Sequence, residues 1–448
     1  MNTLQMKTRQ TYLAAAVFVA QAAIVPVHAE PISQTDYKVP EGLIDTGVMG
    51  GVPCPSAQEL TKMQHSQYVL HARDGKLSKV PVEKIVLPGD PKNHPQHANV
   101  TLLSDGTLYV KQSTVFLKST DGGRSWTSHP FKEAEGQWAP LDDGTFIRIV
   151  KNEYTTDPAA PAQVFRSRDF GGTWQKISEI EMPKGWHFPG VGSIPYQRTG
   201  VTTIPVIRLR NGTLLCNIVV RNMKWTEDGR TIISGTNTPV AYRSTDEGLT
   251  WEGPSNPVID YTGSEGGIVE TASGKLLAAL RYQRPLLPTE SPDRTWETTG
   301  AIPPHGNRRT AKFPGNITPY KHVFLADSED EGRTWKNVRQ LTVVFGQCYP
   351  YPAALSDGTV VVVHDTRYGP GVPSTRAMIS RDEGQSWQDE VYYLAYGKGM
   401  SGYTQSVVLD DDTIVTVSGT SDRTDGDGSY TSWYGHTDWT VIRWRPVE

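Results

Sequence analysis

Cysteine is scarce in this sequence, which holds Cys54, Cys216 and Cys348 among its 448 residues. At most one disulfide could form, so a disulfide framework is excluded. The spacing of the three residues matches no zinc motif, and the sequence has no Gly-rich phosphate loop. The sequence therefore predicts no metal site and no cofactor. We expect the three thiols to act as small apolar side chains.

An excess of charge of one sign is also lacking, because the formal net charge is only −4. A protein that coats nucleic acid normally carries a strongly basic face, so we expect no nucleic-acid partner. Any site for an anionic ligand must therefore be a local cluster of basic residues.

Long hydrophobic runs are missing beyond residue 30, so we expect no membrane span. The first residues differ from the rest of the chain. Lys7 and Arg9 precede an apolar stretch over 11–27, which ends in the small-residue sequence Val27-His28-Ala29. This pattern is typical of a secretory signal peptide, here residues 1–29. We therefore expect a secreted or periplasmic protein, whose oligomeric state the sequence does not indicate.

Turn-forming and aromatic residues are abundant, with 42 Gly, 32 Pro and 12 Trp. One octet, Ser-x-Asp-x-Gly-x-Ser/Thr-Trp, occurs five times, at 119–126, 167–174, 244–251, 328–335 and 380–387. Its Asp can accept hydrogen bonds from backbone N–H groups of its own turn, and its Gly tolerates a positive φ. Its Trp can bury a large ring between neighbouring strands. We interpret the octets as a device of the scaffold and not as part of an active site.

Each octet follows a strand, a turn of the form Asp/Asn/Ser-Gly-Thr/Lys, and a second strand. These strand pairs lie at 97–110, 139–150, 203–220, 265–281 and 349–363, and a sixth pair at 403–419 has no octet. Six units on one plan, with loops of unequal length, predict an all-β fold, a six-bladed β-propeller over residues 97–448. Residues 30–96 form an N-terminal extension, and a strand at 67–72 or 82–88 is expected to complete the last blade. The stretch 284–320 should be a long loop of the fourth blade.

The octets resemble the Asp-boxes of the sialidase (neuraminidase) superfamily, and the resemblance covers about residues 97–446. It implies a secreted exo-glycosidase that removes a terminal acidic sugar, with sialic acid as the first candidate. Aligning the six units on their turn glycine brings six residues to equivalent strand starts on one rim. They are His97, Glu135, Thr203, Glu265, Tyr349 and Tyr403.

Two segments carry the resemblance furthest. In "GSEGGIVETASGKLLAALR", Glu265 is followed sixteen residues later by Arg281, and "SGYTQSVVLDDDTI" is similar to the last-blade segment that holds the nucleophilic tyrosine, here Tyr403. A carboxylate nucleophile would be repelled by the carboxylate of a sialic acid, whereas a neutral Tyr deprotonated by a Glu is not. The resemblance thus implies that Glu265 is the base for Tyr403.

Arginines that grip the substrate carboxylate are also implied. Arg281 fits one such role. In the fifth blade Arg367 and Arg376 are alternatives, and a plain surface position is the favoured interpretation of Arg376. Tyr349 is a further candidate for contact with substrate.

The sequence departs from the sialidase pattern in the first blade. The expected Arg-Ile-Pro is replaced by His97-Ala-Asn, and its nearest echo is Thr203-Ile-Pro. Residues 107–119 contain no Asp and leave no room for the long loop that carries the family's general acid. His97, helped by His94, is the candidate replacement because imidazole titrates near neutrality.

Two other kinds of function remain open. A polysaccharide lyase would use Tyr403 or His97 to remove the proton next to a uronate carboxylate that Arg281 neutralises, and a hydrolase of a neutral sugar could use a single His. A glycan-binding propeller without activity is the non-enzymatic alternative. In each case the expected partner is a carbohydrate.

Overall fold

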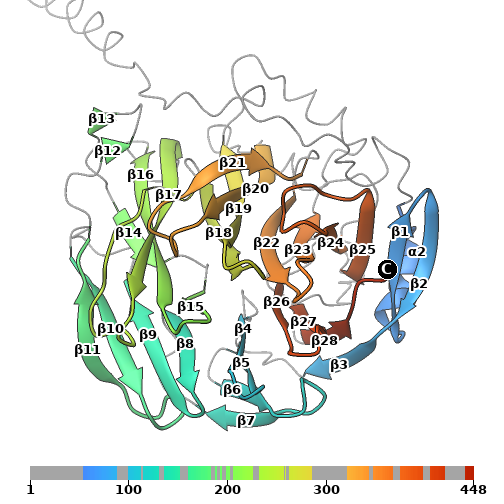
Figure 1. The fold of residues 1–448 in the computed structure, drawn as a ribbon, viewed down its shortest axis with the longest axis horizontal. Coiled ribbons are helices and arrows are strands. Elements are labelled where there is room, and N and C mark those ends of the chain that lie inside the picture. The colour runs from blue at the N-terminus through green and yellow to red at the C-terminus, as the bar shows by residue number, and fades with distance from the viewer. Residues whose placement is uncertain are drawn as a thin grey trace, which may run out of the picture.

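The structure is a computed structural model in which nearly all regular structure is β. It describes residues 54–87, 99–112, 115–130, 136–151, 160–182, 187–188, 192–193, 198–201, 205–225, 232–256, 258, 262–284, 320–342, 347–366, 374–396, 404–418 and 439–448. Six antiparallel sheets follow one another around a ring in the order of the chain (Figure 1). The predicted six-bladed β-propeller is confirmed. The predicted signal peptide, the side chain of Cys348 and all of the predicted loop over 284–320 except its two end residues lie outside the described residues.

Each of the six sheets is a blade, numbered here in chain order. Blade 1 is β4 (Asn99–Leu102), β5 (Leu108–Gln112), β6 (Val115–Ser119) and β7 (Thr127–Pro130). Blade 2 is β8 (Gln137–Asp142), β9 (Thr145–Val150), β10 (Ala162–Ser167) and β11 (Gln175–Ile180). Blade 4 is β18 (Thr262–Glu270), β19 (Leu276–Arg284), β20 (Tyr320–Ser328) and β21 (Lys336–Gln340). In each of them the strands pair in sequence order from the first to the fourth.

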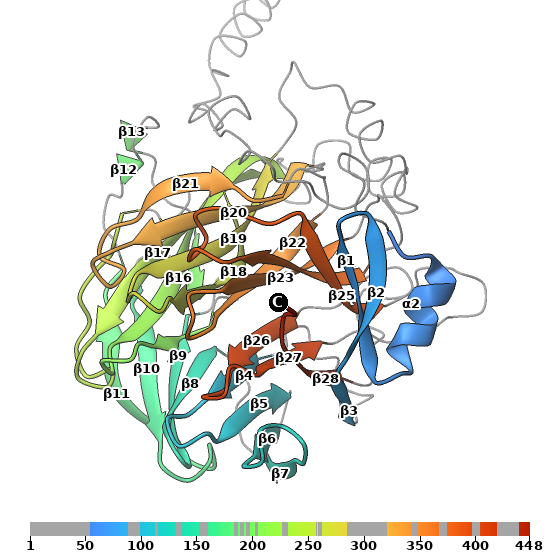
Figure 2. The same ribbon diagram turned by 45° about the vertical axis from the view of Figure 1, so that its right-hand side comes forward.

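The N-terminal segment completes blades 5 and 6. Blade 5 has β22 (Gln347–Ala354), β23 (Val360–Thr366), β24 (Ser374–Ser380) and β25 (Glu390–Tyr396), and it is extended by β1 (Tyr68–Arg73) and β2 (Lys76–Pro81). Blade 6 has β26 (Thr404–Val408), β27 (Ile414–Ser418) and β28 (Trp439–Trp444), and its fourth strand is β3 (Glu83–Leu87). Helix α2 (Ala57–Gln64) lies beside β1 and β2 (Figure 2). It begins with a capping box in which Glu59 N donates to Ser56 Oγ and Ser56 N donates to Glu59 Oε2.

Blade 3 departs from the single first strand that the sequence predicts. Its inner edge is two pieces, β14 (Arg198–Val201) and β15 (Ile207–Arg208), which both pair with β16 (Leu214–Trp225). Pro205 lies between the pieces and has no N–H to give to a ladder, which accounts for a break in the pairing. The long β17 (Ile232–Ser244) follows β16, and the short β12 (His187–Phe188) and β13 (Gly192–Ser193) form a separate hairpin.

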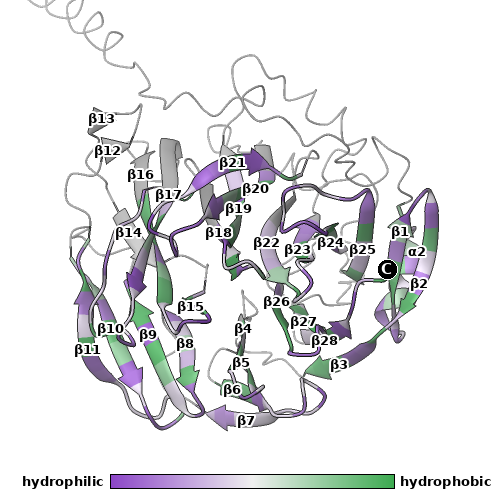
Figure 3. Ribbon diagram, in the orientation of Figure 1, coloured by the Kyte–Doolittle hydropathy of each residue, from purple (hydrophilic) through white to green (hydrophobic). Residues whose placement is uncertain are grey.

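The hydrophobic core is distributed between the blades. Six clusters of buried residues occupy the six interfaces, one for each pair of neighbouring blades. Between blades 4 and 5, for example, Leu277 and Leu325 pack with Val360 and Met378. Hydrophobic colour runs along strands such as β9, and outer strands such as β7 and β21 are hydrophilic (Figure 3). Each blade is therefore stable only between its two neighbours.

The five octets form one repeated turn. In the first, Ser119 Oγ donates to Asp121 Oδ1 (2.8 Å) and accepts from Gly123 N (2.8 Å), while Asp121 accepts from Ser125 N (2.9 Å) and from Ser125 Oγ (2.6 Å). The Ser and Asp bonds recur in the other four copies. These bonds lie within the turn itself, in agreement with a scaffold device.

The octet glycine touches the preceding blade. A Cβ built on Gly248 of blade 3 would lie 2.2 Å from Ile147 Cδ1 of blade 2, and one on Gly332 of blade 4 would lie 2.7 Å from Leu215 Cδ1 of blade 3. Gly384 has the same relation to Leu277. The glycine is therefore needed for close approach of two blades as well as for its positive φ.

Gly248→Ala is expected to reduce the free energy of unfolding by about 2 kcal/mol more than Gly274→Ala does. Both glycines have positive φ, at +84° and +90°, but a Cβ on Gly274 meets nothing within 4 Å. The control therefore carries only the backbone strain, and the difference isolates the interface. Urea unfolding of both variants measures it, and equal losses would contradict the inter-blade role of the octet.

A polar contact joins four of the five octets to the blade before them, and at the second octet Lys118 Nζ of blade 1 lies 5.7 Å from the centroid of the Phe170 ring. The residue just before the octet serine is a cation in three blades, and in blade 6, which has no octet, a cation lies near the end of the third strand. These four residues are Lys118, Arg166, Arg243 and Arg443. Arg166 Nη2 donates to Glu247 O in the next octet (2.7 Å), and Arg443 donates to Gly122 O across the closure of the ring. Blade 5 precedes the blade without an octet and has Ile379 at this position.

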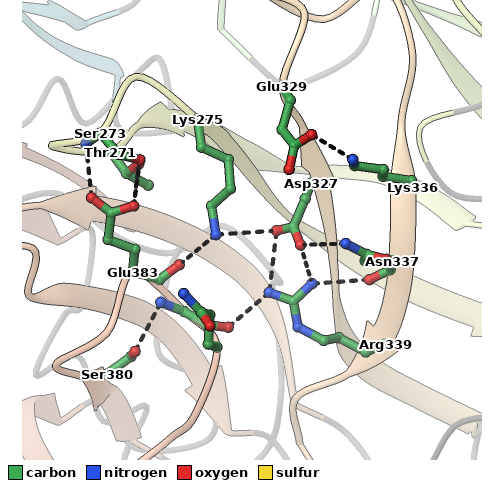
Figure 4. Close-up of polar contacts among 12 residues, drawn as sticks. Thr271, Ser273, Lys275, Asp327, Glu329, Lys336, Asn337, Arg339, Ser380 and Glu383 are labelled. Atoms are coloured by element: carbon green, nitrogen blue, oxygen red, sulfur yellow. Dashed lines mark hydrogen bonds and ion pairs between the residues drawn. The ribbon is translucent and has the colours of Figure 1, made fainter.

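Blade 4 makes the same contact with different residues (Figure 4). Asp327 stands at the cation's place and binds Arg339, whose Nη2 donates to Gly384 O of the fifth octet (2.7 Å). The carboxylate of Glu383 accepts from Ser273 N (2.8 Å), and Lys275 Nζ donates to Glu383 O (2.9 Å). The octets thus stabilise the ring from blade to blade.

A buried network attaches the N-terminal hairpin to blade 5, and we call it the Glu390 network. Glu390 of β25 is 2 % exposed, and its Oε1 lies 3.0 Å from His71 Nε2 of β1 and accepts from Tyr392 Oη (2.7 Å). Arg381 Nη2 donates to Glu390 Oε2 (3.2 Å), and the backbone N–H of Val447 donates to Tyr392 Oη (2.9 Å). One carboxylate therefore links the N-terminal hairpin, the fifth octet and the C-terminal residues.

Candidate functional site

Glu265 lies in a bulge of the first strand of blade 4. Thr262 pairs with Tyr282 and Gly266 with Leu280, so three residues of β18 face one residue of β19, which is Arg281. Gly266 has a φ of +150°, and a Cβ there would lie 2.2 Å from the carbonyl oxygen of Ala279. The bulge therefore requires glycine, and it re-aims the side chain just before it.

Arg281 is ion-paired with Glu265 across this bulge, through Nη1 and Oε2. The two side chains are 13 % and 10 % exposed, so the pair is largely withdrawn from water. A low local dielectric strengthens their attraction and makes a lone charge at either position costly. The sequence placed both residues at the candidate site, and the structure brings them together.

Tyr349 approaches the same arginine from blade 5. It is 3 % exposed, and the centre of the Arg281 guanidinium lies 5.6 Å from the centroid of its ring, within the range of a cation–π interaction. Tyr349 has a φ of +54°, in a second bulge where β22 shifts register between Cys348 and Tyr351. A bulky residue with positive φ is strained, and such strain is concentrated at functional sites.

Tyr351 is a residue of this site that the sequence analysis missed. It is 3 % exposed, and burial together with the charge of Glu265 raises its pKa above the ordinary value for tyrosine. Its position two residues after Tyr349 on a strand was the one available signal, but alignment on strand starts selects a single residue per blade. Two tyrosines of blade 5 therefore accompany the Glu265–Arg281 pair of blade 4.

Arg376 lies on the third strand of blade 5 and is fully buried. The interpretation of this residue as a surface position is wrong. Its Nε donates to Ser374 Oγ (2.9 Å), and its guanidinium lies 5.2 Å from the ring centroid of Tyr393. It is opposite His364 of β23 in the ladder, two strands outward from Tyr349's strand. Arg376 is thus an interior residue of the blade.

Four candidates lie outside the described residues: Tyr403, His94, His97 and Arg367. Their roles stay predictions. Thr404, the first residue of β26, directly follows Tyr403, and this innermost strand of blade 6 lies next to β22. In blade 1, β5 and β6 are separated by residues 113 and 114 alone, so the expectation of no long loop there is confirmed.

The described residues offer little for a metal or a disulfide. Within the described ranges no group of three His, Cys, Asp or Glu side chains could hold a metal ion, and no helix is long and apolar enough to cross a membrane. Neither Cys54 nor Cys216 is part of a disulfide. Cys216 is buried, which raises the pKa of its thiol, and its Sγ lies 3.7 Å from Gln137 Oε1.

Comparison with known proteins concerns the fold. No protein family and no curated protein matches the chain. A protein of unknown function from Dyadobacter fermentans is similar in structure, with a TM-score of 0.50 and 18% identity over 81% of this chain and 98% of that chain. What the two chains share is a fold.

Two glycosidases are also among the similar structures. A Hadza microbial sialidase has a TM-score of 0.48 and 15% identity over 85% of this chain and 74% of its own. An α-L-arabinofuranosidase from Fusarium graminearum has a TM-score of 0.48 and 15% identity over 81% of this chain and 96% of its own.

Proposed function

We propose that this protein is an exported glycoside hydrolase that removes a terminal acidic sugar, with sialic acid as the first candidate. Its nucleophile is Tyr403, and Glu265 is the base that takes the proton of the Tyr403 hydroxyl. The observation that carries the proposal is the buried pair of Glu265 and Arg281 in the bulge of β18, beside the strained Tyr349. Both side chains are largely withdrawn from water, and buried charged groups are concentrated at functional sites.

The proposed reaction has two steps. Glu265 accepts the phenolic proton while the Tyr403 oxygen forms a bond to the anomeric carbon, and the bond from that carbon to the leaving oxygen breaks. His97 gives its proton to the leaving group. In the second step water, deprotonated by the same imidazole, bonds to the anomeric carbon while the bond to the Tyr403 oxygen breaks, and Glu265 returns the proton to that oxygen. Glu265 needs a fixed orientation for this transfer, and its contact with Arg281 supports that role.

The guanidinium of Arg281 supports an acidic substrate. Arg281 contacts Glu265, the proposed base, and a guanidinium can bind two carboxylates at once through its forked N–H groups. A guanidinium carries five N–H donors in a fixed fork, and the contact of Arg281 with Glu265 is made through Nη1. Arg367 is the proposed second contact for the sugar carboxylate.

A neutral sugar is the second candidate substrate. In the unliganded site the charge of Arg281 is balanced by Glu265, and the first-blade Arg-Ile-Pro is replaced by His97-Ala-Asn. An anionic sugar would then meet an arginine whose charge is already neutralised by Glu265. This arrangement favours an uncharged sugar. This alternative keeps the same nucleophile and base and changes only the substrate.

A substrate panel tests the proposal. The purified protein is incubated with aryl sialosides, aryl α-L-arabinofuranosides and other neutral aryl glycosides, and with uronate polysaccharides. Free sugar is measured by chromatography and unsaturated product by ultraviolet absorbance. Release of free acidic sugar is the expected result, and release of a neutral sugar selects the second candidate. Ultraviolet-absorbing product would show a lyase, and binding without turnover of any compound would show a glycan-binding propeller; either result contradicts the proposal.

A further inference from the structure

A serine, a histidine and a glutamate lie in hydrogen-bonding order across β2, β1 and β25, at the outer edge of blade 5. His71 is opposite Ser78 in the ladder of β1 with β2 and opposite Tyr392 in the ladder of β1 with β25. Ser78 Oγ lies 3.4 Å from His71 Nδ1, and His71 Nε2 lies 3.0 Å from Glu390 Oε1. The two ring nitrogens therefore bridge a hydroxyl and a carboxylate.

The burial of the three side chains is that of a fixed base beside an accessible nucleophile. Glu390 is 2 % exposed and His71 is 6 % exposed, whereas Ser78 is an exposed residue of β2, the edge strand of its sheet. The ring of His71 is stacked on that of Tyr392, with 4.4 Å between the centroids. The imidazole is thus held in place, and a substrate can reach the serine from solvent. A distance of 3.4 Å between nucleophile and base is within the range seen in sites without substrate.

The contacts of Glu390 set the tautomer of His71. Tyr392 Oη donates to Glu390 Oε1 (2.7 Å), and Arg381 Nη2 donates to Oε2 (3.2 Å). Burial acts against the charge of Glu390, but the hydrogen bonds from His71 and Tyr392 outweigh it and hold its pKa below the usual value. An ionised carboxylate only accepts hydrogen bonds, so neutral His71 carries its proton on Nε2. Nδ1 is then the acceptor that faces Ser78.

We propose that Ser78, His71 and Glu390 form a second active site, which hydrolyses carboxylic esters of short acyl groups. Ser78 is the nucleophile, His71 is its base, and Glu390 orients the base. An exposed serine on an edge strand offers few contacts to a long acyl chain, so acetyl and similarly short acyl groups are the expected substrates. The site is independent of the proposed glycosidase, because it uses none of the residues assigned to that reaction.

The reaction has two steps. Ser78 Oγ bonds to the ester carbonyl carbon while His71 Nδ1 takes the hydroxyl proton. The bond from that carbon to the alcohol oxygen breaks, and Nδ1 gives the proton to this oxygen. Water, deprotonated by Nδ1, then bonds to the acyl carbon, the bond to Ser78 Oγ breaks, and Oγ regains its proton.

Lys76 is the group that can stabilise the carbonyl oxygen as it becomes negative. Lys76 and Ser78 are two residues apart on β2, whose register with β1 is regular, so by strand alternation they lie on the same face. Lys76 is exposed, and its long side chain carries a cation on the face where the ester is attacked. A cationic donor beside a developing oxyanion lowers the barrier to acyl transfer.

Covalent labelling and ester hydrolysis test the nucleophile. A biotinylated fluorophosphonate is incubated with the purified protein, and peptide mass spectrometry is expected to place the adduct on Ser78, whose oxygen displaces fluoride. With p-nitrophenyl acetate, Ser78→Ala is expected to lower the rate of hydrolysis by about tenfold or more. Ser128→Ala is the control, because Ser128 is an exposed serine on another outer strand, β7, and its rate should equal that of the parent protein. Absence of an adduct on Ser78, or a Ser78→Ala protein as fast as the parent, would overturn the inference.

Glu390→Gln separates a catalytic role from a structural one. Arg381 can only donate, so the amide oxygen is expected at the position of Oε2 and the amide nitrogen at that of Oε1. The amide then donates to His71 Nε2 and moves the imidazole proton to Nδ1, which can no longer accept the proton of Ser78. The rate of phosphonylation of Ser78 is expected to fall about a hundredfold. Circular dichroism reports whether the variant is folded, and an unchanged rate of labelling in a folded Glu390→Gln protein would overturn the inference. If this variant does not fold, the adduct on the unaltered protein and the Ser78→Ala rate decide.

Discussion

Glu265→Gln is expected to lower kcat by about a thousandfold on the substrate of this protein. The amide keeps the size of the side chain and can still accept a bond from Arg281, but it cannot take the proton of Tyr403. KM should change little, because the lost interaction is made in the transition state. Steady-state kinetics with an aryl glycoside measure the effect. Circular dichroism of the variant and of the parent protein reports whether the fold is intact.

The matched control is Glu270→Gln at the other end of the same strand. Glu270 accepts from Arg210 N (2.7 Å) in a turn contact between blades 3 and 4 and has no place in the proposed reaction. Its activity should equal that of the parent protein. Tyr403→Phe should lose as much activity as Glu265→Gln, and the double variant should be no slower than either, since the two groups act as a unit. Additive losses, or a Glu265→Gln protein with full activity, would refute the assignment of the base.

Glu390→Ala is expected to reduce the free energy of unfolding by about 3 kcal/mol, because it leaves the partners of a buried carboxylate uncompensated. The change removes the acceptor for His71 and for Tyr392 at once. The N-terminal hairpin and the last residues of the chain lose their shared contact. Chemical denaturation at pH 7 measures the loss, and amide hydrogen exchange should show it first in β1 and β2.

The pH dependence of stability is a second test of the Glu390 network. Burial acts against the charged form of Glu390, but the hydrogen bonds from His71 and Tyr392 outweigh it and hold its pKa below the usual value of 4.5. A depressed pKa contributes stability that is present above the unfolded-state value and is lost as the pH falls through the folded-state value. The stability gap between the parent protein and Glu390→Ala should therefore shrink below about pH 4.5.

Glu329→Gln provides the control for this pair of measurements. Glu329 contacts Lys336 at 2.5 Å, but both side chains are exposed, at 65 % and 49 %. An exposed ion pair contributes about 0.5 kcal/mol or less. If Glu390→Ala were no more destabilising than Glu329→Gln, the network would not be what attaches the hairpin.

The fold was predictable from the sequence because its repeat is local. An octet sets its own turn through bonds between residues two to four apart, such as Ser119 Oγ to Asp121 and Ser125 to Asp121. The same eight letters therefore indicate the same hairpin wherever they occur. The break in the first strand of blade 3 was not predicted. Thr203-Ile-Pro was interpreted as a variant of the Arg-Ile-Pro motif, and the effect of its proline on strand pairing was not considered.

The candidate site was predictable only in part, because it depends on contacts between blades. Glu265 and Arg281 share a blade and a known spacing, so the sequence could name both. Tyr351 and Gly267 meet across two blades and 84 residues of sequence, so only the folded chain shows their contact. Arg376 was assigned to the surface because it lies just before the fifth octet, whereas the structure buries it on the third strand of blade 5.

The pairing of β3 with β28 has a consequence for how the molecule is made. Residues 83–87 are translated long before residues 439–444, yet these two segments are hydrogen-bonded neighbours. Blade 6 cannot be completed until residue 444 has been synthesised, and every shorter nascent chain presents β3 without its partner strand. Closure of the ring therefore waits for β28, and a premature stop before residue 439 leaves β3 as an unpaired edge.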